Sequence, residues 1–452
     1  SLTNDSSSQE SQGTVGIFFP AQEGTLTVEN SQITGYNVGV QAFTGNITIS
    51  GDQTKITGSG ETHLNGEEGN LATSGPLFDG AAVSIIQRVN EDGSNPYGEF
   101  ETVTIDGGTF TTAATGDSAH GALHVSRYMN TTSGGYTAGF ENKPDSGTQI
   151  VSISGGSFSN KIPSDYCAPG MVPSTSGGTY TVTVDSSVAT DGNGTEASPY
   201  IIRNVGQLKA FRDKVNSGAS YEGVYFALVS GQTYDISDSE WEPIGITVKN
   251  DDTYTDHSFK GHFDGNGATI TGLTMTDDDL ACYNSFNTGY ACYGFFGGVD
   301  GGTVENLRFT SFNIDTPGTA IENPEHGDAC NNTVAVAVGA AVNGTHISGI
   351  TIGTGTVTGA SRAAGVVGYV GAGNAAAPAN SDIPMGEIVV ENCVNYATIT
   401  SNWKASTHGT AGGICATVNA YADEGGSVTF QGNTNNGNVS GYYAAGICAS
   451  TF

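Results

Sequence analysis

The chain has 452 residues, and its 14 Lys and Arg against 45 Asp and Glu give a formal net charge of −31. Nucleic acids and anionic membrane surfaces are bound through basic side chains, so this balance excludes both as expected partners. The longest apolar run, residues 334–342, is too short for a membrane-spanning helix and contains a glycine. We therefore expect no transmembrane segment.

The glycine content indicates an all-β chain. Glycine accounts for 67 residues and proline for 13, while 37% of the residues are hydrophobic. No Gly-X-Y period is present, which excludes collagen, and the apolar residues are regularly patterned, which argues against disorder. Glycine together with Thr, Ser, Asn and Val is typical of many short strands joined by tight turns.

The first part of the chain predicts a weak β-helical repeat. Residues 1–12 are polar, and we expect them to be disordered. Across residues 13–184, apolar-polar-apolar runs followed by a glycine or asparagine corner recur, as in 26–33, 103–110 and 151–158. Alternation turns one face of each strand inward, and units spaced by roughly 25–45 residues must stack to bury that face. The segment ends in a small β module.

A linker and a capping helix separate this repeat from the next. Residues 185–198 are small and polar, and we interpret them as the linker. A short amphipathic helix is expected near 204–217, where Asn204 is a favourable N-cap with Gln207 three residues on. A lone helix before an array of strands is expected to cap the open end of the first coil. Its apolar face consists of Val205, Leu208, Phe211 and Val215.

Residues 199–452 predict a second, more regular β-helix. In residues 259–275, two short strands are separated by Asp264-Gly-Asn-Gly, residue types that accept the positive φ of a tight turn. Each later unit adds a glycine-rich inner strand and two further short strands. Three strands per coil predict a right-handed, pectate-lyase-like parallel β-helix. The last repeat is incomplete, and we expect the chain to be a C-terminally truncated piece of a longer secreted protein.

Five motifs between residues 191 and 297 carry a resemblance to a known family. They are residues 191–195 (DGNGT), 205–211 (VGQLKAF), 241–245 (WEPIG), 259–275 and 294–297 (GFFG). With them, the chain resembles bacterial cell-surface β-helix proteins with GLUG-type repeats, which are adhesin-like. The resemblance implies a right-handed β-helix at the bacterial cell surface. Similar repeats accompany IgA-cleaving metallopeptidases, whose HExxH signature this sequence lacks.

We expect a non-enzymatic, extracellular adhesin-like protein whose rigid β-helix presents side loops to a host or microbial glycan or protein. The export signal and anchor are not in this chain, and we expect a monomer. The alternative is a polysaccharide-degrading lyase or glycoside hydrolase, which needs clustered carboxylates, for a lyase beside an Arg or Lys. No such set stands in the repeat register, so no catalytic residue is assigned. A structural spacer is the second alternative.

Two tracks of insertions interrupt the second segment, and one of them carries aromatic residues. Tyr283, Phe286, Tyr290 and Trp403 belong to this track, together with acidic runs. Loops on one side of a solenoid commonly form its binding face, so these four are the candidate ligand-binding residues. The alternative is that the rings pack the loops onto the coil.

The acidic run Asp277, Asp278 and Asp279 in the same track is the candidate metal site. Carboxylate oxygens are the ligands that calcium prefers, so loop calcium is the cofactor that we consider here. The alternative is that these carboxylates are solvated loop residues. No other cofactor is expected.

Seven cysteines form no CxxC pair, so a zinc site has no support in the sequence. Cys282 and Cys292 lie in one insertion, and a disulfide between them is a hypothesis. Cys415 and Cys448 occupy equivalent positions in neighbouring units. They are expected to stack inside the coil as small apolar side chains.

Overall fold

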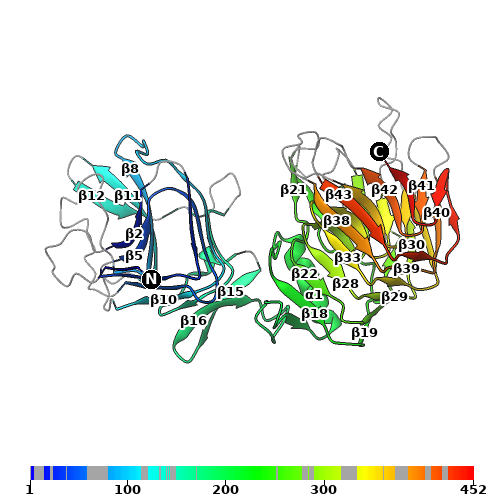
Figure 1. Ribbon diagram of the computed structural model, residues 1–452, viewed down its shortest axis with the longest axis horizontal. Helices are drawn as coiled ribbons and strands as arrows, with labels where there is room; N and C mark the ends of the chain where they lie inside the picture. Colours follow the sequence, from blue (N-terminus) through cyan, green and yellow to red (C-terminus); the bar gives the residue numbers. More distant parts are fainter. Residues whose placement is uncertain are drawn as a thin grey trace. The chain divides into compact units, whose positions relative to one another are not determined.

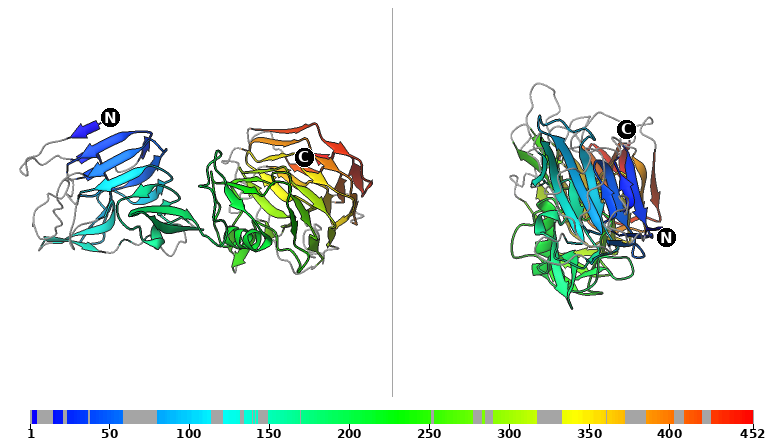
Figure 2. Two further views of the ribbon diagram at one scale, coloured as in Figure 1. Left: turned by 90° about the horizontal axis from the view of Figure 1, so that it is seen from below. Right: turned by 90° about the vertical axis from the view of Figure 1, so that its left-hand side faces the viewer.

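The structure is a computed structural model of the chain, which divides into two compact units, Ser1–Val184 and Asp185–Phe452. Figures 1 and 2 show each unit as a stack of strands coloured in chain order. The described residues are 2–4, 15–20, 24–36, 38–58, 80–113, 121–131, 134–138, 140, 142, 149–168, 170–250, 253–276, 283–284, 290–316, 333–359, 361–371, 385–402, 409–419 and 426–451.

Unit 1 is a parallel β-helix with three sheets around its core. The first sheet has the order β1 (Leu2–Asn4), β4 (Gln32–Gly35), β7 (Lys55–Gly58), β10 (Thr109–Thr112), β14 (Ser157–Phe158), β16 (Thr179–Val184) and β15 (Met171–Ser176). The second has the order β12 (Gly134–Ala138), β11 (Leu123–Thr131), β8 (Val83–Asn90), β5 (Val38–Ala42) and β2 (Val15–Phe19), and the third β13 (Val151–Ile153), β9 (Phe100–Ile105), β6 (Gly45–Ser50) and β3 (Thr25–Glu29).

Alternating side chains build the coil of unit 1. In β6, Ile47 and Ile49 are fully buried while the residues beside them are half-buried. Phe110 and Phe158 hold the same position in consecutive coils, and their rings stack with 4.7 Å between centroids. A 3₁₀ helix, η1 (Ser164–Tyr166), then leads to the antiparallel pair β15–β16, which closes the first sheet. Each coil therefore buries its apolar face against the next.

Unit 2 is a parallel β-helix with five narrow sheets. The first sheet is β17 (Tyr200–Ile202), β18 (Tyr225–Leu228), β22 (His262–Asp264), β28 (Thr303–Glu305), β33 (His346–Ser348), β38 (Gly386–Glu391) and β43 (Gly426–Gln431), and the second is β19 (Thr233–Asp235), β23 (Thr269–Thr271), β29 (Arg308–Thr310), β34 (Thr351–Ile352), β39 (Val394–Asn395) and β44 (Thr434–Asn435). The third, named the threonine sheet below, is β24 (Thr274–Met275), β30 (Asn313–Thr316), β35 (Thr356–Gly359), β40 (Thr398–Ser401) and β45 (Val439–Ser440).

The two remaining sheets complete each turn of unit 2. The fourth is β21 (Thr253–Asp256), β20 (Thr247–Asn250), β25 (Tyr283–Asn284), β26 (Tyr290–Tyr293), β31 (Thr333–Ala335), β36 (Arg362–Ala364), β41 (Thr410–Gly412) and β46 (Tyr443–Ala445). The fifth is β27 (Phe296–Asp300), β32 (Val338–Val342), β37 (Val367–Gly371), β42 (Cys415–Asn419) and β47 (Cys448–Thr451). One turn runs through β26, β27, β28, β29 and β30 before β31 pairs with β26.

These sheets confirm the prediction of an all-β chain with two consecutive parallel β-helices. Three strands per coil describe unit 1, but that prediction is wrong for unit 2, which has five. Residues 303–310 do not form one strand but are split into β28 and β29 at Asn306, whose φ is 56°. Asn392 does the same between β38 and β39 with a φ of 54°. Asparagine reaches this left-handed conformation at little cost, so the chain bends there without a glycine.

Helix α1 (Val205–Asn216) confirms the predicted capping helix. The Asn204 Oδ1 accepts a hydrogen bond from the Gln207 backbone N–H at 2.9 Å, and the Gln207 Oε1 accepts one from the Arg203 N–H at 2.7 Å. Leu208, Phe211 and Val215 are fully buried, as the spacing predicts. The Phe211 ring packs against the rings of Tyr221, Phe226, Phe259 and Phe263. The helix therefore covers the apolar start of this coil.

The motif at residues 241–245 belongs to the same core. Trp241 is 1% exposed, its ring stacks on Phe295 at 5.2 Å, and its indole N–H donates to the Phe295 carbonyl at 3.1 Å. The Arg212 guanidinium of α1 lies over the indole, 4.9 Å from the ring centroid. These contacts tie the helix to the coil, so the role of the motif is structural.

The Asp264-Gly-Asn-Gly turn forms a corner of the coil. Asn266 and Gly267 have φ values of 51° and 73°. The Asp264 Oδ1 accepts hydrogen bonds from the Asn266 N–H at 2.7 Å and from the Asn306 Nδ2 at 2.9 Å. This carboxylate thus closes its own turn and holds the corner of the next coil.

Two segments expected to lack structure take part in the units. Val188 and Ala189, within the stretch interpreted as a linker, are buried, and Asp185 forms an ion pair with Lys214 at 2.8 Å. Strand β1, within the stretch expected to be disordered, pairs in parallel with β4. A polar composition does not exclude strand β1, because strand pairing uses backbone groups and needs few apolar side chains.

Candidate functional site

The structure tests few of the predicted site residues. Tyr283 lies in β25, where its backbone pairs with Thr247 of β20, and Tyr290 lies in β26. Cys292, in β26, is buried. The ligand, calcium and disulfide hypotheses therefore stay predictions. The residues outside the described part of the chain are Phe286, Trp403, Asp277, Asp278, Asp279 and Cys282.

The insertions that hold these residues join the same two sheets. Strands β24, β30, β35 and β40 of the threonine sheet are followed by β25, β31, β36 and β41 of the fourth sheet. The second track joins the fifth sheet to the first, from β32 to β33, β37 to β38 and β42 to β43. The two tracks predicted from the repeat alignment thus begin and end at fixed edges of unit 2.

The outward face of the threonine sheet carries two columns of polar side chains. Ile314, Val357 and Ile399 point into the coil and are fully buried, so the residues on either side of them point outward. Neighbouring strands repeat every ~4.8 Å. We name the following eight residues the threonine face: Thr274, Asn313, Thr356 and Thr398 in one column, and Asp315, Thr358, Thr400 and Ser440 in the other.

The central threonines of this face keep their hydrogen-bonding groups available. Within the described part of the chain, the hydroxyl groups of Thr356, Thr358, Thr398 and Thr400 form no hydrogen bond. Each hydroxyl offers one donor and two acceptor positions to the solvent side. The face is therefore a regular array of hydroxyl groups that are not bonded within the described protein.

The outward face of the first sheet differs, because its polar groups bond to one another. The His262 Nδ1 lies 3.1 Å from the Thr303 Oγ1, and the His346 Nε2 lies 3.1 Å from the Glu391 Oε1. The Tyr225 ring stacks on His262 at 4.0 Å. Burial lowers the pKa of His262, which favours the neutral ring. This face is the weaker candidate for a ligand.

An exposed tyrosine stands beside the threonine sheet. Tyr396 lies in the connection from β39 into β40 and is 47% exposed. Tyr442 and Tyr443 are also exposed, but Thr410 and Arg362, at the position of Tyr443 in the two preceding coils, are buried, so this exposure marks the open end of the last coil. A tyrosine ring presents apolar area that suits the C–H groups of a sugar, and hydroxyl groups match sugar hydroxyl groups. Together they form a surface suited to carbohydrate.

The charge of the threonine face indicates which class of ligand it suits. Asp315 is the one charged residue of the threonine face, and the whole chain is strongly acidic. An anionic ligand would be repelled, so the face suits a neutral one. Among the described residues, no three His, Cys, Asp or Glu side chains come together as a metal site.

A cluster with the residue types of an enzyme lies at the corner between the fifth and first sheets. Lys260 pairs with Asp300 at 2.9 Å, and the Asn343 Nδ2 donates to the Asp300 Oδ1 at 2.8 Å. Burial raises the pKa of Asp256, which accepts a hydrogen bond from the Ser258 N–H. Burial lowers the pKa of Lys260, but the bond to Asp300 outweighs it and the net pKa is raised. A lysine that stays protonated is no base, so this cluster ties the corner together.

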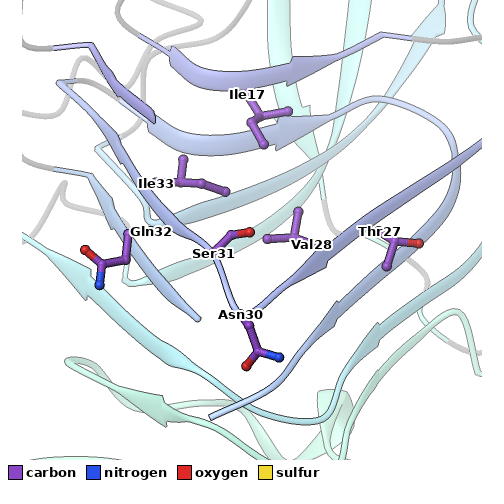
Figure 3. A pocket seen from close by; sticks show the side chains of 7 residues that line it. All are labelled: Ile17, Thr27, Val28, Asn30, Ser31, Gln32 and Ile33. Carbon is purple, nitrogen blue, oxygen red and sulfur yellow. The ribbon is translucent and has the colours of Figure 1, made fainter. Parts of the chain in front are cut away.

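Unit 1 holds a pocket of about 380 Å³ at its first coil, lined by Ile17 of β2, Val28 of β3, Ile33 of β4 and four polar neighbours. Figure 3 shows these three apolar side chains around a common space. In later coils the equivalent space is core, because the next coil covers it. The pocket is therefore the end of the apolar core rather than a built ligand site.

No family model matches the chain. A curated protein described as "Putative Gly-rich membrane protein", from Evansella cellulosilytica, is 31% identical over 141 residues, and the match covers 30% of this chain and 13% of that protein. A solved structure described as a "putative immunoglobulin A1 protease", from Bacteroides ovatus, aligns with a TM-score of 0.33 and 18% identity over 58% of this chain and 77% of that one. In the described part of the chain, no helix is long and apolar enough to span a bilayer.

The comparisons leave the resemblance to GLUG-type repeats as a prediction. The threonine face and the exposed Tyr396 beside it were missed by sequence reasoning. Their signal is the recurring Thr-x-Thr at residues 356–358 and 398–400. Only the register of the strands turns this repeat into outward columns.

Proposed function

We propose that the chain is part of an extracellular, bacterial cell-surface protein that is adhesin-like and non-enzymatic. Its second β-helix binds a neutral glycan on the threonine face, and the insertions along one edge add further contacts. The observation that supports this most is the array of threonine hydroxyl groups that form no bond within the protein, beside the exposed Tyr396. Insertions that recur between the same pairs of sheets support a role for side loops in contacting the ligand.

The first experiment is a search for the ligand. The full chain is applied to an array of neutral and anionic glycans and to a panel of host proteins. Binding to one or more neutral glycans, without their cleavage, is expected. Depolymerisation of a polysaccharide would support the enzyme alternative. Binding to proteins alone would overturn the glycan assignment. No binding on any panel would leave the spacer alternative.

The second experiment locates the binding. The double variant Thr356→Val and Thr398→Val removes two hydroxyl groups from one column and keeps the β-branched shape. Each hydrogen bond to a ligand is worth about 0.5–1.5 kcal/mol, so affinity is expected to fall about 10-fold. The matched control, Thr269→Val with Thr351→Val, removes two outward hydroxyl groups from the second sheet. Titration calorimetry that gives equal losses for both pairs would place the site elsewhere.

A further inference from the structure

Two cysteines face each other in consecutive coils of unit 2. Strands β42 and β47 are parallel, and their register places Cys415 directly opposite Cys448. Residues opposite each other in neighbouring strands lie on the same side of the sheet, and the strands are ~4.8 Å apart. That spacing falls within the ~4.4–6.8 Å that separates the Cα atoms of a disulfide. Cys415 is fully buried and Cys448 is half-buried.

The two thiols also interact chemically. Each sulfur donates to a carbonyl two residues on, from Cys415 to Thr417 and from Cys448 to Ser450, both at 3.4 Å. An interaction with the Cys415 thiol lowers the pKa of Cys448, while burial raises the pKa of Cys415. The thiolate therefore forms first on Cys448, beside a buried thiol.

Two other buried cysteines provide a contrast. Burial raises the pKa of Cys393 to about 12 and that of Cys167 to about 11. The Cys393 sulfur donates to the Glu391 carbonyl at 3.1 Å, and no described cysteine contributes to either pKa. These two thiols have the environment of inert core residues.

We propose that Cys415 and Cys448 are a thiol modification site, at which a small-molecule disulfide such as oxidised glutathione forms a covalent bridge between β42 and β47. The Cys448 thiolate attacks one sulfur of the reagent, whose S–S bond breaks and releases one glutathione thiolate. Cys415 then loses its proton and attacks the Cys448 sulfur of the mixed disulfide, which releases the second glutathione. The two protons from the protein go to the two glutathione thiolates, and two electrons pass from the protein to the reagent.

The test uses the full chain in a series of glutathione redox buffers, quenched in acid, alkylated under denaturing conditions and mapped by peptide mass spectrometry. Cys415 and Cys448 are expected to lose alkylation together, at least 10-fold in the most oxidising buffer, with a linked peptide pair that reductant removes. Cys393 is expected to stay alkylated throughout. If Cys415 and Cys448 remain alkylated in every buffer, the proposal is overturned.

Two variants identify the order of the steps. In Cys415→Ser, Cys448 is expected to accumulate a glutathione adduct that persists, because the resolving thiol is gone. In Cys448→Ser, Cys415 is expected to stay reduced. An equal adduct on Cys415 in the second variant would refute the assignment of Cys448 as the attacking thiol. Should either variant fail to fold, the linked peptide pair in the unaltered chain still decides whether the bridge forms.

Discussion

Phe211 is the residue whose removal tests most directly how unit 2 is held together. Phe211 belongs to α1, and its ring is fully buried. It contacts four other rings, and the distances between ring centroids range from 4.8 Å for Phe226 to 5.7 Å for Tyr221. Phe→Ala in a core costs about 3–5 kcal/mol, a range that already includes the lost ring contacts. We therefore expect Phe211→Ala to lower the stability of unit 2 by about 4 kcal/mol. For a domain of this size, that corresponds to a fall of about 8–16 °C in its melting temperature.

The assay is thermal and urea unfolding of the full chain, followed by far-UV circular dichroism and by tryptophan fluorescence. Fluorescence reports on this core because Trp241 lies beside Arg212 of the same helix. The control is Asp213→Ala, on the exposed side of α1, where the Asp213 side chain is 60% exposed although it pairs with Arg212. That variant is expected to change stability by less than about 0.5 kcal/mol. If the two variants shift the transition by similar amounts, α1 is not the cap that the packing describes.

Two further predictions concern polar contacts of unit 2, measured by the same unfolding assay. The hydrogen bond from Lys214 holds the pKa of Asp185 at about 2, below its ordinary 3.8. A depressed folded-state pKa adds stability above the unfolded pKa and loses it as the pH falls from about 4 through about 2, so Asp185→Asn should cost about 1–2 kcal/mol at pH 7 and progressively less as the pH falls to about 2 and below. A pH-independent cost would contradict the ion pair. Asn395, fully buried, donates to the Asn435 Oδ1 at 2.8 Å and accepts from the Ala397 N–H at 3.0 Å. Asn395→Ala should cost about 2–3 kcal/mol because it leaves that N–H unpaired, whereas Asn438→Ala, at an exposed position, should be nearly neutral.

The sequence predicts the parts of this fold that depend on local chemistry. Asn204 and the spacing of Leu208, Phe211 and Val215 identify the helix and its buried face, because capping and amphipathic periodicity are local properties. The number of sheets per coil is not local in this sense. Whether Asn306 continues a strand or turns a corner depends on the hydrogen bond that its side chain gives to Asp264 of the preceding coil. A single repeat does not reveal that contact.

The same distinction between local and non-local features applies to the candidate site. Aromatic residues in long insertions are visible in the sequence, and Tyr283, Phe286, Tyr290 and Trp403 stay predictions. The threonine face depends on which side of each strand points outward, and this follows from the burial of residues such as Val357 and Ile399. Tyr396 sits in a short turn that carries no insertion. An alignment of the repeats singles out long insertions, so a residue in a short turn is not selected as a candidate.

The threonine face and the Cys415–Cys448 pair have one physical cause. In a parallel coil, residues at the same repeat position become neighbours in space, one strand spacing apart, although 30 to 45 residues separate them in a chain such as this. A residue type that recurs at an outward position therefore becomes a column that a long ligand contacts several times, whereas one that recurs at an inward position becomes a stack. For the outward column, each rung adds a similar contact. We therefore expect the affinity lost in single-rung Thr→Val variants to be small and nearly equal, and to accumulate as further rungs are changed.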